Sequence, residues 1–376
     1  MQKLGIGVIG CGNISTAYMR LAPLFNGIEM RACADMNAEA ARARAEEYGL
    51  RALTVEELLA ADDVALVVNL TIPAAHFEVS KRVLEAGKHV YSEKPFVLTL
   101  EEGEALRALA SQKSLRVGSA PDTFLGASHQ LARQLVDDGA VGKITSGTCF
   151  VMSPGMEMWH PNPDFFFQAG GGPVLDLGPY YVSNLVQLLG PVKRVCAMTS
   201  MGSDYRTITS QPRAGERIKV ETPTTIHAVL QFHSGAQVTF ISSWDVWQHG
   251  HSSMELYGQA GTLHVPDPNF FGGEVRMTAK QGFVNAPGMD HPLGVTNAVD
   301  GRGVPQANYR CAGLADMAQA ILDGRGHRCS LEFALHVVDV MTAILRSGEM
   351  GAFIEMTTTC ERPEALGPDA ARALMA

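Results

Sequence analysis

The sequence predicts an α/β protein with an N-terminal Rossmann-type, doubly wound parallel sheet and a second α/β domain. Three observations predict it: an apolar segment that runs into a glycine turn, regular alternation of apolar strands and helices up to about residue 120, and short strands without intervening helices after that. Such alternation is typical of parallel sheets with helices on both faces. For a chain of 376 residues we expect two domains, 1–121 and 122–376, with a C-terminal helix able to pack back on the first.

The expected elements of the first domain follow from hydrophobic periodicity. The strands are expected at 4–9, 28–34, 64–70, 88–91 and 116–119, and the helices near 13–22, 37–48, 55–60, 75–86 and 99–112. In such sheets, ligands bind at the carboxyl ends of the strands. The residues that follow each strand are therefore the candidate site residues.

The stretch LGIGVIGCGNIS, residues 4–15, is typical of a strand that turns into a helix beside a dinucleotide. Gly10 makes the tight turn, Gly12 lets phosphate approach the backbone, and the small Ser15 lets helix and strand pack closely. The Ser15 hydroxyl either caps the helix or reaches a phosphate. We expect the cofactor's diphosphate to be bound by Gly10, Gly12, Asn13, Ile14 and Ser15.

A carboxylate ends the next strand. Asp35 follows Gly10 by 25 residues, near the spacing of a ribose-binding acidic residue. Its carboxylate would accept hydrogen bonds from the ribose hydroxyls and repel a 2′-phosphate, and neither Met36 nor Asn37 supplies a cation, so NAD is favoured over NADP. The alternative for Asp35 is an N-cap of the helix that follows.

Two later strand ends carry unusual side chains. VVNL is followed by Thr71 and Pro73, and then by His76, which either faces the cofactor or is a capping or surface residue. HVYSEKPF places Glu93 and Lys94 at the mouth of the expected crevice, where an ammonium group polarises a substrate oxygen. These residues complete the expected cofactor set: Thr71, Pro73, His76, Glu93 and Lys94.

Composition narrows the class of partner. The net charge of -9 comes without a basic patch, which excludes a nucleic-acid binder and favours a small molecule. The seven cysteines contain no CxxC pair, so reduced thiols are expected rather than a disulfide frame or a zinc site. No apolar run approaches a membrane span, and the first strand leaves no room for a signal peptide, so a cytoplasmic protein is expected.

GCGNIS, TIP followed by His76, and AGKHVYSEKP together resemble the Gfo/Idh/MocA family of NAD(P)-dependent oxidoreductases, and the resemblance continues through GGGPVLDLGPYY and GLADMAQAI. It implies a Rossmann domain followed by an α/β domain with a large, mostly antiparallel open sheet. One face of that sheet covers the nicotinamide, and the other often forms an oligomer interface, so a homodimer or homotetramer is expected. The residues agree, because HSGA joins the strands expected at 224–232 and 236–244 as a tight hairpin turn.

The motif GGGPVLDLGPYY supplies the expected chemistry. Asp176 and Tyr180 are four residues apart, so they share one helical face. Many relatives carry histidine where this chain has Tyr180, and DxGxY is also found in glucose-fructose oxidoreductase and dihydrodiol dehydrogenase. A tyrosine base needs a nearby cation at neutral pH, for which Lys94 is the candidate. We hypothesise that Tyr180 takes the hydroxyl proton while Lys94 and Asp176 hold substrate oxygens; the alternative is that both helical residues pack and cap.

Candidate sugar contacts lie elsewhere in the second domain. Trp159 and His160, in EMWHPNPDFFF, form a loop that closes over a sugar with a stacking face, or else an aromatic anchor of the domain junction. Trp244, in WDVWQHGH, is weighed evenly between a sugar contact and an interface residue, and Asp122 is expected to line the crevice. The histidines of WDVWQHGH lack a third ligand at metal spacing, so no metal is expected.

These residues favour an NAD-dependent sugar or polyol dehydrogenase that transfers hydride from a carbinol carbon to NAD+. Oxidation of an aldose at C1 to its lactone ranks first, with a pentose, including a branched one such as apiose, as substrate. Three alternatives stay open: an inositol or glycoside ring-hydroxyl dehydrogenase, an NAD-dependent glycosidase, and a non-catalytic NAD-binding protein. We expect substrate specificity to reside in the loops.

Overall fold

The computed structural model describes residues 2–280, 282–300 and 303–376. The chain divides into two compact units. Unit 1 holds the chain up to Ala127 together with Met289–Leu335 and Pro363–Ala376, and unit 2 holds Ser128–Gly288 and His336–Arg362. The expected domain 122–376 is thus not continuous, because residues 122–127, 289–335 and 363–376 belong to the unit that begins the chain.

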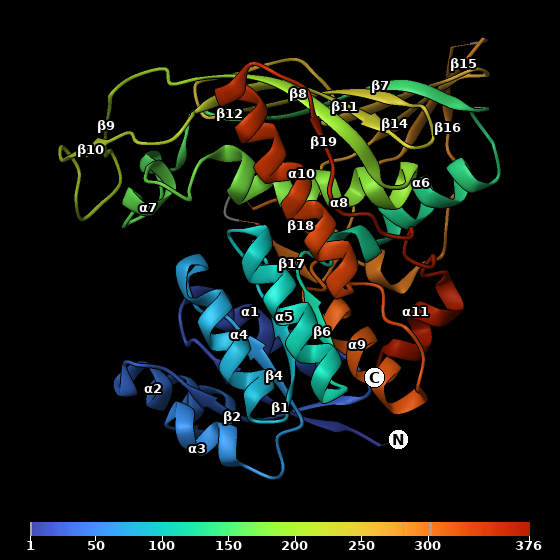
Figure 1. The fold of residues 1–376 in the computed structure, drawn as a ribbon. Helices are drawn as coiled ribbons and strands as arrows, with labels where there is room; N and C mark the ends of the chain where they lie inside the picture. Colours follow the sequence, from blue (N-terminus) through green and yellow to red (C-terminus); the bar gives the residue numbers. More distant parts are fainter. Residues whose placement is uncertain (1, 281, 301–302) are drawn as a thin grey trace. The chain divides into compact units, whose positions relative to one another are not determined.

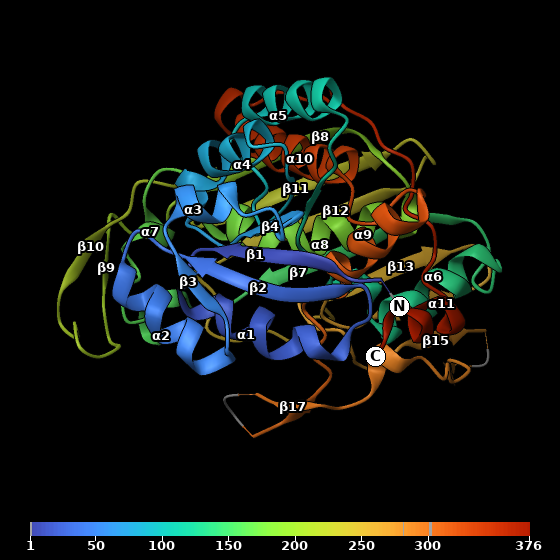
Figure 2. The same cartoon turned by 90° about the horizontal axis from the view of Figure 1, so that it is seen from below.

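Unit 1 is built on a six-stranded sheet in the order β3-β2-β1-β4-β5-β6 (Figure 2). All of its strand pairs are parallel, which confirms the predicted fold class. The strands are β1 Leu4–Ile9, β2 Ile28–Ala34, β3 Arg51–Leu53, β4 Leu66–Asn69, β5 His89–Ser92 and β6 Val117–Ser119. Only β3 was not predicted, since three largely exposed residues carry no apolar signal.

The helices between these strands are α1 Asn13–Leu21, α2 Ala38–Tyr48, α3 Val55–Ala60, α4 His76–Glu85 and α5 Leu100–Lys113. Local side chains determine where they begin. Thr54 and Thr99 each form a capping box with the glutamate three residues later. The side chain of Asn37 accepts hydrogen bonds from the first amides of α2. Asn37 is therefore the N-cap of α2, and the alternative that Asp35 caps this helix is wrong.

The returning segments of unit 1 contribute α9 Ala312–Asp323, α11 Pro368–Leu374 and the small hairpin β17 Ala298–Val299 and β18 Pro305–Gln306. Helix α9 packs against β6 and β2, and α11 packs against α9. Leu314, Ala315 and Met317 of α9 are fully buried. This apolar helix therefore completes the core around the parallel sheet, which explains why it belongs to unit 1.

Unit 2 is built on a nine-stranded sheet in the order β16-β15-β14-β13-β7-β12-β11-β8-β19 (Figure 1). Its pairs are antiparallel except for β12 with β7, as the family resemblance implies. The strands are β7 Ile144–Met152, β8 Val192–Ser200, β11 Thr225–Phe232, β12 Gln237–Ser243, β13 Met254–Gly258, β14 Thr262–Val265, β15 Arg276–Ala279, β16 Gly282–Asn285 and β19 Ile354–Glu355. The predicted hairpin is confirmed as β11 and β12.

The helices of unit 2 are α6 Ala127–Asp137, α7 Asp164–Phe167, α8 Pro173–Leu189 and the part of α10 Leu331–Met350 that follows Leu335. Helix α8 lies along one face of the sheet, against β7, β11 and β12 (Figure 1). A separate hairpin is formed by β9 Tyr205–Thr207 and β10 Arg217–Lys219. The other face of the sheet exposes Met198 and Val229, and an oligomer contact there stays a prediction. No helix within the described part of the chain is long and apolar enough to cross a membrane.

His336, on α10, is a buried histidine that stabilises unit 2 only when neutral. Its Nε2 accepts a hydrogen bond from the Val192 amide at 2.9 Å, and its Nδ1 lies 3.0 Å from the Thr358 hydroxyl. Burial lowers the pKa of His336 to about 4. The unfolded chain therefore binds a proton at this site at higher pH than the folded chain does, and stability must fall as the pH drops from about 6.5 to about 4.

We predict that His336→Gln weakens the acid sensitivity of the fold. Between pH 6.5 and 5, the wild type should lose about 1–2 kcal/mol more unfolding free energy than the variant, because glutamine keeps an acceptor but does not titrate. Urea unfolding at both pH values measures the difference. Equal losses in the two proteins would contradict the assignment of this acid sensitivity to His336.

Candidate active site

The glycine turn after β1 combines one crowded and one open position. Gly10 has φ +103°, and a Cβ there would lie 2.6 Å from the Leu70 carbonyl, so no other residue fits. A Cβ on Gly12 would meet nothing within 4 Å. Helix α1 begins directly afterwards, and within the described residues no side chain caps it and no acidic residue lies in its first turn. Its amides are thus open to an anion, and the turn fits a diphosphate.

Ser15, in the first turn of α1, is fully buried. Its hydroxyl donates to the Gly12 carbonyl at 2.6 Å and accepts from Arg44 Nε at 3.2 Å. It therefore closes the turn, and its proton is engaged inside the protein rather than offered to a phosphate or used as a cap. Arg44 was not predicted as a site residue, because no sequence motif marks it and it reaches the turn from α2.

Asp35 lies at the carboxyl end of β2 and is half-buried. One carboxylate oxygen accepts from the Cys11 amide at 2.7 Å, and the other accepts from the Asn37 amide at 2.8 Å. The carboxylate thereby joins the end of β2 to the glycine turn. A carboxylate oxygen can accept two hydrogen bonds, so the same side chain has capacity to accept from ribose hydroxyls as well.

The loop after β4 is held by two buried polar side chains. Asn69 accepts from the amide and the hydroxyl of Thr71, and it donates to the His76 carbonyl. The imidazole nitrogens of His76 lie 2.7 Å from the Pro95 carbonyl oxygen and 3.0 Å from that of Thr71. His76 is 1% exposed, and burial lowers its pKa. The surface alternative for His76 is wrong, because its buried ring joins two loops. A contact of His76 with the cofactor stays a prediction.

The loop after β5 is fixed through Glu93. Its carboxylate accepts from the Tyr18 hydroxyl and from the Lys94 amide, both at 2.9 Å. The Glu93 carboxylate is thus bound by one side chain and one backbone amide, and it fixes the position of the Lys94 backbone. Pro73 begins a single 3₁₀ turn, Pro73–Ala75, before α4.

Two exposed apolar side chains follow the strands of unit 1 at the same edge as these polar groups. Met36 is 101% exposed and follows β2, and Ile72 is 69% exposed and follows β4. Apolar side chains left open beside polar strand ends offer a surface for a flat ring. The sequence signal that would have found them is an apolar residue directly after a strand-end Asp or Thr.

Asp176 and Tyr180 both lie on α8, as predicted, in unit 2. The helix begins at Pro173 after Gly172, whose φ is +91°, and Asp176 lies in its first turn. Asp176 is half-buried, and Tyr180 is 8% exposed. The next tyrosine, Tyr181, donates to an Asp267 oxygen at 2.8 Å, which confirms that it points elsewhere.

Asp122 does not line a crevice as expected. It is 2% exposed, and one of its oxygens accepts from the amides of Cys311 and Gly313, both at 3.0 Å. Burial raises the pKa of Asp122. The carboxylate therefore holds the start of α9, a partner that lies 189 residues away in the chain and that no local pattern shows.

Trp244 is a core residue, so the expectation of a sugar contact is wrong. Its side chain is fully buried, with ring centroids 5.8 Å from Phe166 and 5.4 Å from Phe167, both edge-on. Its place at the end of β12 points the indole into this aromatic cluster. Trp159 is 65% exposed and packs edge-on against His160. A sugar contact at Trp159 and His160 stays a prediction.

In the described ranges, no three histidines, cysteines or carboxylates gather around a common point. The imidazoles of His249 and His251 are 5.9 Å apart, and that of His251 stacks on Phe150. These rings are therefore accounted for by packing.

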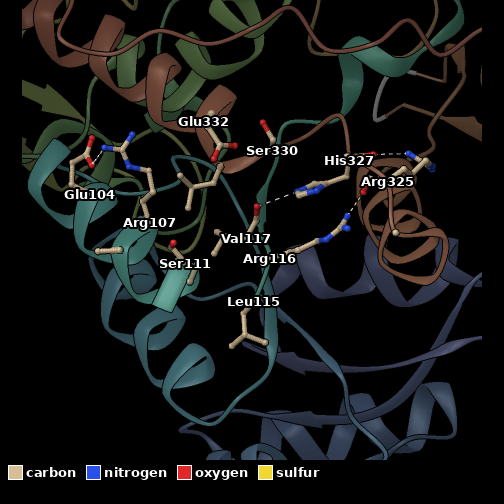
Figure 3. A pocket seen from close by; sticks show the side chains of 15 residues that line it. Glu104, Arg107, Ser111, Leu115, Arg116, Val117, Arg325, His327, Ser330 and Glu332 are labelled. Carbon is tan, nitrogen blue, oxygen red and sulfur yellow. Dashed lines mark hydrogen bonds and ion pairs between the residues drawn. The ribbon is translucent and has the colours of Figure 1, made fainter. Parts of the chain in front are cut away.

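A hollow of about 900 Å³ opens in unit 1 between α5 and the segment before α10 (Figure 3). Arg116 donates to the Arg325 carbonyl, a His327 ring nitrogen lies 3.1 Å from the Val117 carbonyl oxygen, and Arg107 pairs with its own helix neighbour Glu104. Arg116 and Val117 lie at the amino end of β6, whereas the candidate site residues follow the carboxyl ends of strands. This hollow is therefore not part of the candidate site.

Comparison with known families gives two matches. Residues 4–120 match the model described as an oxidoreductase family with an NAD-binding Rossmann fold, and residues 129–264 match the GFO/IDH/MocA C-terminal domain. D-xylose 1-dehydrogenase (NADP(+)) 2 of Haloferax volcanii is 27% identical over 93% of this chain and 99% of its own. The 1,5-anhydro-D-fructose reductase of Ensifer adhaerens is 25% identical over 68% of this chain and 74% of its own.

Solved structures show the same fold. Levoglucosan dehydrogenase in complex with NADH and L-sorbose superimposes with a TM-score of 0.79 at 22% identity, covering 95% of this chain and 100% of that one. At this identity the likeness establishes the fold alone.

We predict that the two tryptophans differ sharply in their effect on stability. Trp244→Ala should cost about 3–5 kcal/mol of unfolding free energy, because it empties a buried aromatic cluster. Trp159→Ala should change that free energy by no more than about 0.5 kcal/mol. Denaturant unfolding of both variants measures this, and comparable losses would contradict the core assignment of Trp244.

Proposed function

The chain belongs to the GFO/IDH/MocA family of oxidoreductases, and we propose that it acts as an NAD-dependent sugar dehydrogenase. The observation that carries the proposal is the pair Asp176 and Tyr180 on one turn of α8, in a chain that also places Lys94 after β5. A carboxylate, a phenol and an ammonium group suit the removal of a proton from a sugar hydroxyl. The names of the relatives given above also describe sugar oxidoreductases.

We assign cofactor binding to the strand ends of unit 1. Gly10, Gly12 and the start of α1 would hold the diphosphate, Asp35 the adenosine ribose, and the exposed side chains of Met36 and Ile72 the adenine faces. Bound NAD+ would supply the hydride acceptor. NAD is preferred over NADP in this proposal, because the Asp35 carboxylate would repel a 2′-phosphate.

We assign the proton and the substrate oxygens to three side chains. Tyr180 accepts the proton of the reacting hydroxyl, while Lys94 stabilises the phenolate and, with Asp176, holds the sugar oxygens. Glu93 and His76 act indirectly, since they hold the backbone at Lys94 and Pro95. Trp159 offers an exposed aromatic face for a sugar ring, and the half-buried His160 packs edge-on against it.

The substrate that this proposal ranks first is an aldose oxidised at C1 to its lactone, with a pentose such as xylose or the branched apiose as the first candidates. A ring hydroxyl of an inositol or a glycoside is the second candidate. The name of the Haloferax volcanii relative, which matches nearly the whole chain, supports the C1 assignment.

We predict that Tyr180→Phe lowers kcat for the best sugar by about 10²–10⁴-fold, with little change in KM, because it removes the proton acceptor without removing the ring. NADH formation at 340 nm, with a panel of aldoses, inositols and glycosides, measures the effect. Tyr181→Phe is the matched control, since it removes a hydroxyl that faces Asp267, and its turnover should stay within about threefold of the wild type.

Normal turnover of Tyr180→Phe at every pH would show that another group takes the proton. Release of the chromophore from a chromogenic glycoside without net NADH would instead identify a glycosidase. Tight NAD binding without turnover on any sugar or glycoside would identify a non-catalytic protein.

We predict that Asp35→Ser lowers the preference for NAD over NADP by about tenfold or more, since it removes the charge that repels the 2′-phosphate. The ratio of kcat/KM for the two cofactors measures this. The control is Glu39→Gln, which removes an exposed carboxylate from the first turn of the same helix α2. It should leave the ratio unchanged. An unchanged ratio in Asp35→Ser would show that Asp35 does not determine the preference for NAD over NADP.

A further inference from the structure

Arg44 reaches the glycine turn from a neighbouring helix. It lies on α2 next to the buried residues Ala41 and Ala45, and its side chain is only 25% exposed. Its Nε donates to the Ser15 hydroxyl at 3.2 Å, and that hydroxyl donates to the Gly12 carbonyl at 2.6 Å. The Arg44 cation is therefore the first donor in a chain of hydrogen bonds that runs through Ser15 to the carbonyl of Gly12, the residue preceding α1.

Asp35 places a carboxylate at the glycine turn, where the Cys11 and Asn37 amides bind it. The groups beside the Arg44–Ser15–Gly12 chain favour an anion. The first turn of α1 contains no acidic residue, and its first amides have no side-chain acceptor within the described residues. The one carboxylate that pairs with Arg44 in the described chain is Glu47, at 2.5 Å on the outer side of α2. Hydrogen bonds in a chain polarise one another. The hydrogen bond from Ser15 to the Gly12 carbonyl therefore increases the partial positive charge at the N-terminal end of α1.

We propose that Arg44 is a further cofactor-binding determinant, which acts through Ser15 and through its charge to hold the diphosphate. The inference rests on the proposed NAD-dependent function and extends it, because the predicted set of cofactor residues contains no cation at the glycine turn. Arg44 is a positioning residue, since it touches Ser15. Its contribution is expected for ligands that carry the diphosphate and not for adenosine alone.

The same helix provides a matched control. Arg42 pairs with Glu39 three residues away, just as Arg44 pairs with Glu47, but its side chain is 59% exposed. Among the described residues, the hydrogen bond of Arg42 goes to Glu39 and not to the glycine turn. If Arg44 were only a helix-surface ion pair, Arg42→Met and Arg44→Met would behave alike.

The test is a binding titration of the purified full chain with NAD+, ADP-ribose and adenosine, by calorimetry or tryptophan fluorescence. Arg44→Met should weaken the affinity for NAD+ and for ADP-ribose on the order of 10-fold and should leave the affinity for adenosine within about twofold of the wild type. The loss should shrink as salt rises from about 0.05 to 0.5 M, because screening weakens the same charge in the wild type. Arg42→Met should bind all three ligands like the wild type, and Arg44→Lys should recover part of the affinity.

Two further variants separate a binding role from a purely structural one. Glu47→Gln releases Arg44 from its ion pair and should tighten ADP-ribose by about twofold to threefold, a gain that a damaged fold does not produce. Ser15→Ala removes the bridging hydroxyl and should weaken ADP-ribose, with a smaller added loss on combination with Arg44→Met.

The outcomes distinguish this inference from the function on which it rests. If the wild type binds NAD+ and ADP-ribose and Arg44→Met binds them equally well, the role of Arg44 is overturned while the proposed function stands. Equal losses for adenosine and ADP-ribose would also overturn it, since they indicate a distorted fold. If the wild type binds neither NAD+ nor NADP+, the proposed function itself fails.

Discussion

The close approach of Gly10 to Leu70 is the constraint on which the cofactor site depends. A side chain at Gly10 would lie 2.6 Å from the Leu70 carbonyl, so only glycine lets the turns after β1 and β4 meet. Asp35 is tied to the same turn through the Cys11 amide. Asn69 donates to the His76 carbonyl within the β4 loop, and the His76 ring ties this loop to the loop that carries Lys94. Buried, hydrogen-bonded side chains thus fix each strand end, and the exposed groups between them are left for a ligand.

Features with local signals, most of them in unit 1, could be predicted from the sequence. The bounds of β1 and β2 were predicted to the residue, and the glycine turn, the strand-end Asp35 and the hairpin of β11 and β12 follow from short-range patterns. The place of Asp176 and Tyr180 on one helix follows from their spacing alone. A pattern of this kind needs no knowledge of the distant chain.

The rest depends on contacts between segments that are far apart in sequence. Asp122 was predicted to line the crevice. It instead accepts hydrogen bonds from the amides of Cys311 and Gly313 at the start of α9, a distant segment of the chain that packs in unit 1. Trp244 is of a residue type that is common in sugar sites, yet the direction of its strand places it among buried aromatic rings. Arg44 shows the opposite case, a residue without a motif that the packing of α2 beside α1 brings to the glycine turn.

The measurement that tests the central claim most directly is isotope transfer from a sugar deuterated at C1. The protein is incubated with NAD+ and deuterated xylose, apiose or another aldose, and the reduced cofactor is analysed by mass spectrometry and proton NMR. We expect reduced cofactor that carries the deuterium at C4 of the nicotinamide, together with the lactone or its acid. Reduced cofactor without deuterium would place the oxidation at another carbon, and no reduced cofactor from any sugar or polyol would contradict the dehydrogenase.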